Sequence, residues 1–314
     1  MARLSLKALW GLCVVCALLS ACGENHPPEI DGYAEARRLA AAGKYTAAVA
    51  ACKQVLEADS QHIEARLLLA RLDLTQGRLG LAAQLAEQAV QLAPDHTNAY
   101  ALLGNIYVRQ RRNADAAAIY QEGLRTDPDR VDLYRKLAIA HADDGRYSEA
   151  IKTLQQALER AADDPAIHYN LGVIYERQAQ YDNASDAFIR TTELDTTYGD
   201  AYFRLGQIQS KQGQVAGAAS NFARVIRLRP DYAPPYIGLG QIFVQQGRLD
   251  EAERLFKQAA TIDPFAAEAY HRLATLILRQ GDQERGEQLL TIFKRIQPVS
   301  GEIDRFRYIL SLYP

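Results

Sequence analysis

The side chains best suited to metal binding or nucleophilic catalysis in this 314-residue chain are its histidines and cysteines. The six histidines are His26, His62, His96, His141, His168 and His271. None has a second histidine or a cysteine at metal-ligand spacing, and no HExxH-like pattern occurs. No glycine-rich phosphate loop or Ser/His/Asp set stands out. The sequence therefore predicts no catalytic residue, metal site or cofactor, and we expect the protein not to be an enzyme.

The cysteines indicate a different chemistry, acylation of a thiol near the N-terminus. Arg3 and Lys7 precede an apolar stretch, residues 8–19, that is shorter than the roughly 20 residues of a transmembrane helix. The stretch ends in Leu19-Ser20-Ala21-Cys22, which resembles the lipobox of bacterial lipoproteins. The resemblance implies lipidation of Cys22, with a signal peptide over residues 1–21 and a lipidated tether over 22–28. The alternative is ordinary secretory cleavage after Ala21, a route that Leu19 suits poorly.

Two or three acyl chains on one cysteine would hold the protein stably at a membrane. Gly23 follows Cys22, where enterobacterial lipoproteins retained in the inner membrane carry Asp. We therefore expect the protein on the outer membrane, facing the periplasm. Cys13 and Cys16 would leave with the leader, and Cys52 is expected to be a small buried apolar residue.

The rest of the chain repeats every 34 residues, in eight units over residues 29–300. Position 8 of each unit is Ala or Gly, from Ala36 to Ala274, and so is position 20, from Ala48 to Gly286. Small residues recur where two helix backbones come close together. Such a period predicts stacked pairs of helices, each too small to bury its own apolar face.

Turn residues mark the ends of these helices. Position 15 is Gly in six units, with Arg111 and Ala179 as exceptions, and should end the first helix of each pair. Proline recurs at position 32, where it cannot continue the second helix. Asp164 is placed to cap the helix that begins at Pro165.

These columns, together with Tyr at position 4, Leu at position 7 and aromatic residues at positions 11 and 24, resemble the tetratricopeptide repeat family. The run Tyr169-Asn170-Leu171-Gly172-Val173-Ile174-Tyr175 is close to that family's consensus. The resemblance implies an all-α superhelical solenoid whose first helix of each pair, helix A, lines a concave face. After Pro298, Ser300 is expected to begin a separate capping helix over residues 301–314.

The charge balance bears on the partner. The chain has 36 basic and 38 acidic side chains, which argues against nucleic-acid binding because such proteins carry a marked basic excess. In some members of the family, lysine and asparagine side chains on the A helices clamp the C-terminal carboxylate of a peptide. Arg135, Asn170 and Arg204 match that pattern, whereas Ile139 and Asp200 depart from it.

The candidate partner-binding residues lie on the predicted A helices of the fourth to seventh units. They form a groove with basic and aromatic side chains, suited to a peptide with acidic groups. The residues are Arg135, Lys136, Tyr169, Asn170, Arg177, Phe203, Arg204, Gln207, Lys211 and Gln241.

Two functions remain open from the sequence. The first is a membrane-anchored scaffold that binds proteins during cell-envelope assembly, at a secretin or pilus, a polysaccharide exporter or the peptidoglycan machinery. The second is a periplasmic module that binds glycan or peptidoglycan, with Tyr169 and Phe203 as stacking rings. The sequence does not indicate an oligomeric state.

Overall fold

The computed structural model describes residues 32–312, and this range contains helices and turns but no strand. The predicted lipobox and tether therefore lie outside the described residues. The chain divides into two compact units, Met1–Leu102 and Leu103–Pro314. Within residues 32–102 the first unit contains four complete helices: α2 (Gly32–Ala41), α3 (Tyr45–Ala58), α4 (Ile63–Thr75) and α5 (Leu79–Leu92).

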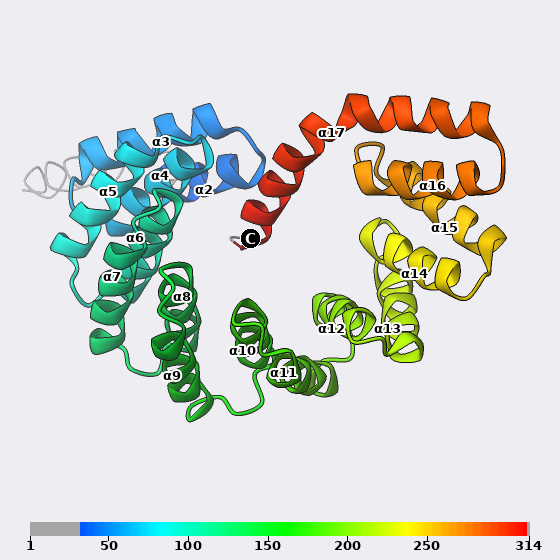
Figure 1. Ribbon diagram of the computed structural model, residues 1–314. Helices are drawn as coiled ribbons and strands as arrows, with labels where there is room; N and C mark the ends of the chain where they lie inside the picture. The colour runs from blue at the N-terminus through cyan, green and yellow to red at the C-terminus, as the bar shows by residue number, and fades with distance from the viewer. Residues whose placement is uncertain (1–31, 313–314) are drawn as a thin grey trace, which may run out of the picture. The chain divides into compact units, whose positions relative to one another are not determined.

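The helix α6 (Thr97–Arg109) contains the boundary, and the second unit continues from it through consecutive antiparallel pairs (Figure 1). Its helices are α7 (Asn113–Thr126), α8 (Val131–Asp143), α9 (Tyr147–Leu158), α10 (Pro165–Arg177), α11 (Tyr181–Leu194), α12 (Gly199–Lys211), α13 (Val215–Leu228), α14 (Pro234–Gln245), α15 (Leu249–Ile262), α16 (Ala267–Arg279) and α17 (Gln283–Leu312).

The helix boundaries follow the 34-residue period. Every second helix of a pair, helix B, begins at position 17, as at Tyr45, Tyr147 and Gln283. Helix A begins at position 1 in α4, α6, α8, α10, α12 and α16. The predicted all-α class of paired helices is confirmed.

The turn from helix A to helix B requires a left-handed backbone conformation at position 15. The six glycines there have positive φ, for example 76° at Gly145. Arg111 and Ala179 adopt the same conformation, at 62° and 57°. All eight units therefore share this turn geometry. In two of them the residue has a Cβ, and the left-handed conformation is sterically unfavourable for it.

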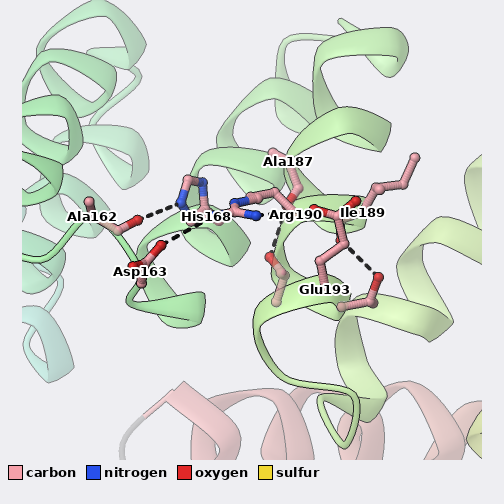
Figure 2. A network of polar contacts seen from close by, with 9 residues as sticks. Ala162, Asp163, His168, Ala187, Ile189, Arg190 and Glu193 are labelled. Carbon is pink, nitrogen blue, oxygen red and sulfur yellow. Dashed lines mark hydrogen bonds and ion pairs between the residues drawn. The ribbon is translucent and has the colours of Figure 1, made fainter.

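The turn between units is held by a side chain at position 4. The hydroxyl groups of Tyr100, Tyr134 and Tyr236 donate to the carbonyl six residues earlier, at 2.8–3.1 Å. His168 takes the same place, with Nε2 3.1 Å from the carbonyl oxygen of Ala162 (Figure 2). In these four units the side chain at position 4 therefore satisfies a turn carbonyl as well as filling space.

Ionic contacts support the same junction. Arg190 of α11 lies between Asp163 and Glu193, with nitrogen–oxygen distances of 3.1 and 3.2 Å (Figure 2). Asp164 caps α10 as predicted, because its Oδ1 accepts from the backbone amide of Ala166 at 2.8 Å.

The two small-residue columns lie in the core. The alanines at position 20, from Ala48 to Ala252, and those at position 8 are fully buried. Cys52 is also buried, beside Ala36 and Ala48, and burial raises the pKa of its thiol to about 11. The expected role of Cys52 as a small apolar core residue agrees with this environment.

The C-terminal end departs from the expectation. A new helix was expected to begin at Ser300, but α17 runs without interruption from Gln283 to Leu312 and contains Pro298. Figure 1 shows that α17 bends along its length. Proline removes one helical hydrogen bond and clashes with the carbonyl four residues earlier, yet a helix can continue past it with a kink. The separate helix start at Ser300 is wrong.

Candidate helix-A interface

The ten candidate residues all lie on A helices of the second unit. They are Arg135 and Lys136 in α8, Tyr169, Asn170 and Arg177 in α10, Phe203, Arg204, Gln207 and Lys211 in α12, and Gln241 in α14. Helix α8 packs beside α10, and α12 beside α14. None of the ten side chains belongs to the fully buried core. The helical periodicity of the sequence therefore predicted correctly that these ten residues lie on A helices, and each side chain is at least partly open to solvent.

Arg204 is held by two neighbours on α10. Its Nη1 donates to Oε2 of Glu176 at 2.9 Å, and its Nε lies 3.4 Å from the hydroxyl of Tyr169. Burial alone would lower the pKa of the guanidinium, but Tyr169 and Glu176 together raise it. Arg204 is thus charged and already paired with an acid of its own chain.

Two other cations of the set are also paired. Arg177 donates from Nη1 to Oδ1 of Asp143 at 2.5 Å, which links α10 to α8. Lys136 lies 3.7 Å from Asp132, and burial lowers the pKa of its ammonium. Both pairs are partly exposed and therefore contribute little to stability, but they neutralise charge on the interface.

The predicted stacking rings are half-buried and packed against other rings. Tyr169 lies 5.6 Å from Phe188 and 5.0 Å from Tyr198, measured between ring centroids. Phe203 lies 5.9 Å from Phe222 and 5.5 Å from Tyr232. These contacts bury ring surface that a sugar would need, so the rings act mainly as packing groups between helices.

Sequence reasoning missed the residues at position 34 that complete this packing. Burial raises the pKa of both Tyr198 and Tyr232. Arg229 lies 4.5 Å over the ring of Tyr232 and donates to Asp200 at 2.7 Å. The repeated Tyr at position 34 was the available signal. The pairing with Arg229 also gives Asp200 a role where the family's clamp would have a lysine.

The remaining five candidate residues make few polar contacts, and only one of them, Gln241, has an acidic partner. Arg135, Asn170 and Gln207 make no hydrogen bond or ion pair within residues 32–312, and Nε of Arg135 is shielded from solvent without a partner. Lys211 lies 5.7 Å over the ring of Tyr181, and Gln241 donates to Glu268 at 3.1 Å. Among the half-buried residues of the set, Arg135, Asn170 and Gln207 are therefore the ones with unused hydrogen-bonding capacity.

Other kinds of site receive no support within residues 32–312. Among the side chains that the structure describes, those of residues 32–299, 301 and 302, no group of three or more His, Cys, Asp or Glu is arranged to hold a metal ion. Across the same residues, no helix has the length and apolarity that crossing a membrane requires.

Structural comparison finds several solved structures that are similar to this chain. The pilF protein of Pseudomonas aeruginosa is 19% identical, with 68% of this chain and 96% of that chain aligned at a TM-score of 0.57. MamA of Desulfovibrio magneticus RS-1, from residue 41 onward, is 21% identical over 54% of this chain and 96% of its own, with a TM-score of 0.49. YrrB, described as a TPR protein with an unusual peptide-binding site, is 20% identical over 59% and 97%, at 0.48.

No curated protein matches the sequence significantly. Two family models described as tetratricopeptide repeat match it. One covers residues 71–131, 101–165, 135–195 and 169–233, and the other covers 39–80, 209–277 and 243–294. Neither describes a catalytic family, and repeats of this kind form protein-binding scaffolds. The chain belongs to the tetratricopeptide repeat family.

Proposed function

We propose that this protein is a lipid-anchored scaffold of the bacterial cell envelope, and that it binds protein partners through the A helices of its second unit. The anchor is Cys22, and the location is the periplasmic face of the outer membrane. The partners belong to envelope assembly: a secretin or pilus system, a polysaccharide exporter or the peptidoglycan machinery. An anchored scaffold raises the local concentration of such partners and favours avidity.

The observation that carries this proposal is the unused polar capacity on α8, α10 and α12. Arg135, Asn170 and Gln207 are half-buried and make no hydrogen bond or ion pair in the described chain. Most polar groups of low exposure are satisfied in folded proteins. A guanidinium and two amides on three successive A helices suit an extended or helical peptide segment with acidic and amide groups.

The glycan alternative gains no such support, because Tyr169 and Phe203 pack against rings of their own chain. Their ring surface is committed to packing between helices. We therefore favour the protein scaffold.

The test is a crosslinking pull-down from the native envelope with Arg135→Glu. We expect recovery of the wild-type partners to fall several-fold, because one half-buried cation at the centre of an interface contributes more than the residues around it. The matched control is Arg227→Glu, the same charge change at an exposed residue of α13. Equal recovery with Arg135→Glu and Arg227→Glu would remove the A-helix face from the proposal.

A further inference from the structure

The contact between Arg204 and Glu176 has the form of an occupied acid-binding site. Arg204 projects from α12, and the carboxylate that it binds comes from α10 of the preceding repeat. Its side chain is 31% exposed, whereas that of Glu176 is only 17% exposed. A guanidinium is the usual group for binding carboxylates at protein interfaces. Here the chain supplies its own carboxylate beneath a guanidinium that still reaches the surface.

The remaining geometry around Arg204 is suited to hold an anion. Nε approaches the hydroxyl of Tyr169, Nη1 binds Glu176, and Nη2 makes no hydrogen bond or ion pair in the described part of the chain. Tyr169 is fixed in turn by its ring contacts with Phe188 and Tyr198. Arg204 is therefore preorganised to bind an anion, but the carboxylate of Glu176 already balances its charge.

We propose that Glu176 is a specificity-determining residue: it fills the carboxylate site of Arg204, so that an acidic group of a partner is bound at Arg135 and excluded from Arg204. This inference rests on the proposed function, because it concerns the same surface. A partner carboxylate at Arg204 would meet the like charge of Glu176 close by, and such a juxtaposition selects against it. Arg135 has no carboxylate in direct contact.

The proposal predicts that neutralising Glu176 strengthens the binding of acidic peptides. In Glu176→Gln, Arg204 keeps a hydrogen-bonding neighbour of the same size but loses its counter-charge. We expect the variant to bind acidic peptides more tightly than the wild type, because Arg204 then becomes a further cation of the interface without a carboxylate partner.

The experiment uses the full-length chain in detergent and two fluorescein-labelled probes. One is a short peptide of alternating Asp, Glu and Ser, and the other has Asn and Gln in place of the acids. Fluorescence anisotropy should show about a tenfold lower Kd for the acidic peptide with Glu176→Gln than with the wild type. The double variant Glu176→Gln with Arg204→Gln should return to the wild-type value. The neutral peptide should not distinguish the variants.

The matched control is Glu193→Gln, which removes an acid paired with Arg190 on helix B of the same repeat. It should leave binding of both peptides unchanged. Circular dichroism should show unchanged helicity for each variant. The inference is overturned if helical Glu176→Gln shows no gain, if the gain survives Arg204→Gln, or if Glu193→Gln gives the same gain. Because these probes are synthetic, the outcome is separate from the envelope pull-down that tests the scaffold.

Discussion

The ring of Phe188 in α11 occupies the space in which a side chain on Gly172 of α10 would begin. A Cβ on Gly172 would lie 2.6 Å from Cε1 of Phe188. The relation recurs through the chain. Position 8 is Gly in the four units whose position 24 is aromatic, with the pairs Gly104 and Tyr120, Gly172 and Phe188, Gly206 and Phe222, Gly240 and Phe256. Where position 24 is Cys, Ala or Leu, position 8 is Ala.

Gly172→Ala should therefore destabilise the protein, by about 1–3 kcal/mol as is usual for an overpacked core. The unfolding midpoint in urea, followed by circular dichroism, measures the effect. Adding Phe188→Leu should recover part of the loss, since it recreates the Ala138 and Leu154 pair of the preceding repeat. Gly80→Ala is the control, because a Cβ on Gly80 meets no atom within 4 Å. An equal effect at Gly80 and Gly172 would contradict the packing explanation.

Arg111→Gly and Ala179→Gly should each stabilise the protein. Both residues have positive φ, which costs about 1–2 kcal/mol for a residue with a Cβ. Glycine removes that cost, but it also raises the conformational entropy of the unfolded chain, which opposes folding. We therefore expect the free energy of unfolding to rise by about 0.5–1 kcal/mol. The reverse change, Gly145→Ala, should destabilise by a similar amount, and thermal unfolding measures all three. Stabilisation by Gly145→Ala would show that the turn conformation is not the cause.

His141 should make the protein less stable in acid. Its side chain is 4% exposed, its Nδ1 has no partner, and burial, with a contribution from Arg146, lowers its pKa below the ordinary 6.5. Glu149 and Asp144 act in the opposite direction but do not reverse the shift. The unfolded chain therefore binds a proton more readily than the folded one. The stability associated with neutral His141 is present above pH 6.5 and is lost as the pH falls below it.

The variant His141→Phe should be less sensitive to this pH range. Other units carry Tyr107, Tyr175 and Phe243 at the same position, so an aromatic ring fits there. Urea midpoints measured at pH 5 and pH 8 should differ less in the variant than in the wild type. His168→Phe, at a half-buried histidine of the next repeat, is the comparison. An unchanged difference in His141→Phe would assign the acid sensitivity to other groups.

Cys22→Ser should release the protein from the membrane fraction into the soluble periplasm, because the acylated thiol is the proposed anchor. Cys16→Ser, a change within the proposed leader, should leave the protein in the membrane fraction. Fractionation of the envelope followed by immunoblotting gives the distribution. If Cys22→Ser remains membrane-bound, a feature other than the lipid holds the protein there.

Sequence periodicity alone determined the helix pairs and the set of A-helix residues that reach solvent. The positions of Ala, Gly and Pro recur every 34 residues, and helix geometry converts that recurrence directly into faces and ends. The same pattern held a further rule, the match of Gly at position 8 to a ring at position 24. The physical reason for that match became clear only from the contact between the two positions in the structure.

The partners of the exposed groups were decided by the tertiary structure. Arg204 binds Glu176, Arg177 binds Asp143, and the rings of Tyr169 and Phe203 pack against other rings. The position of a residue in the repeat predicts which face of the helix it occupies. Charge pairing between neighbouring helices depends in addition on how the helices pack side by side and on the direction of each side chain. Likewise, Pro298 was read as a helix end, whereas α17 accommodates it, because the local cost of a proline can be offset by the rest of the helix.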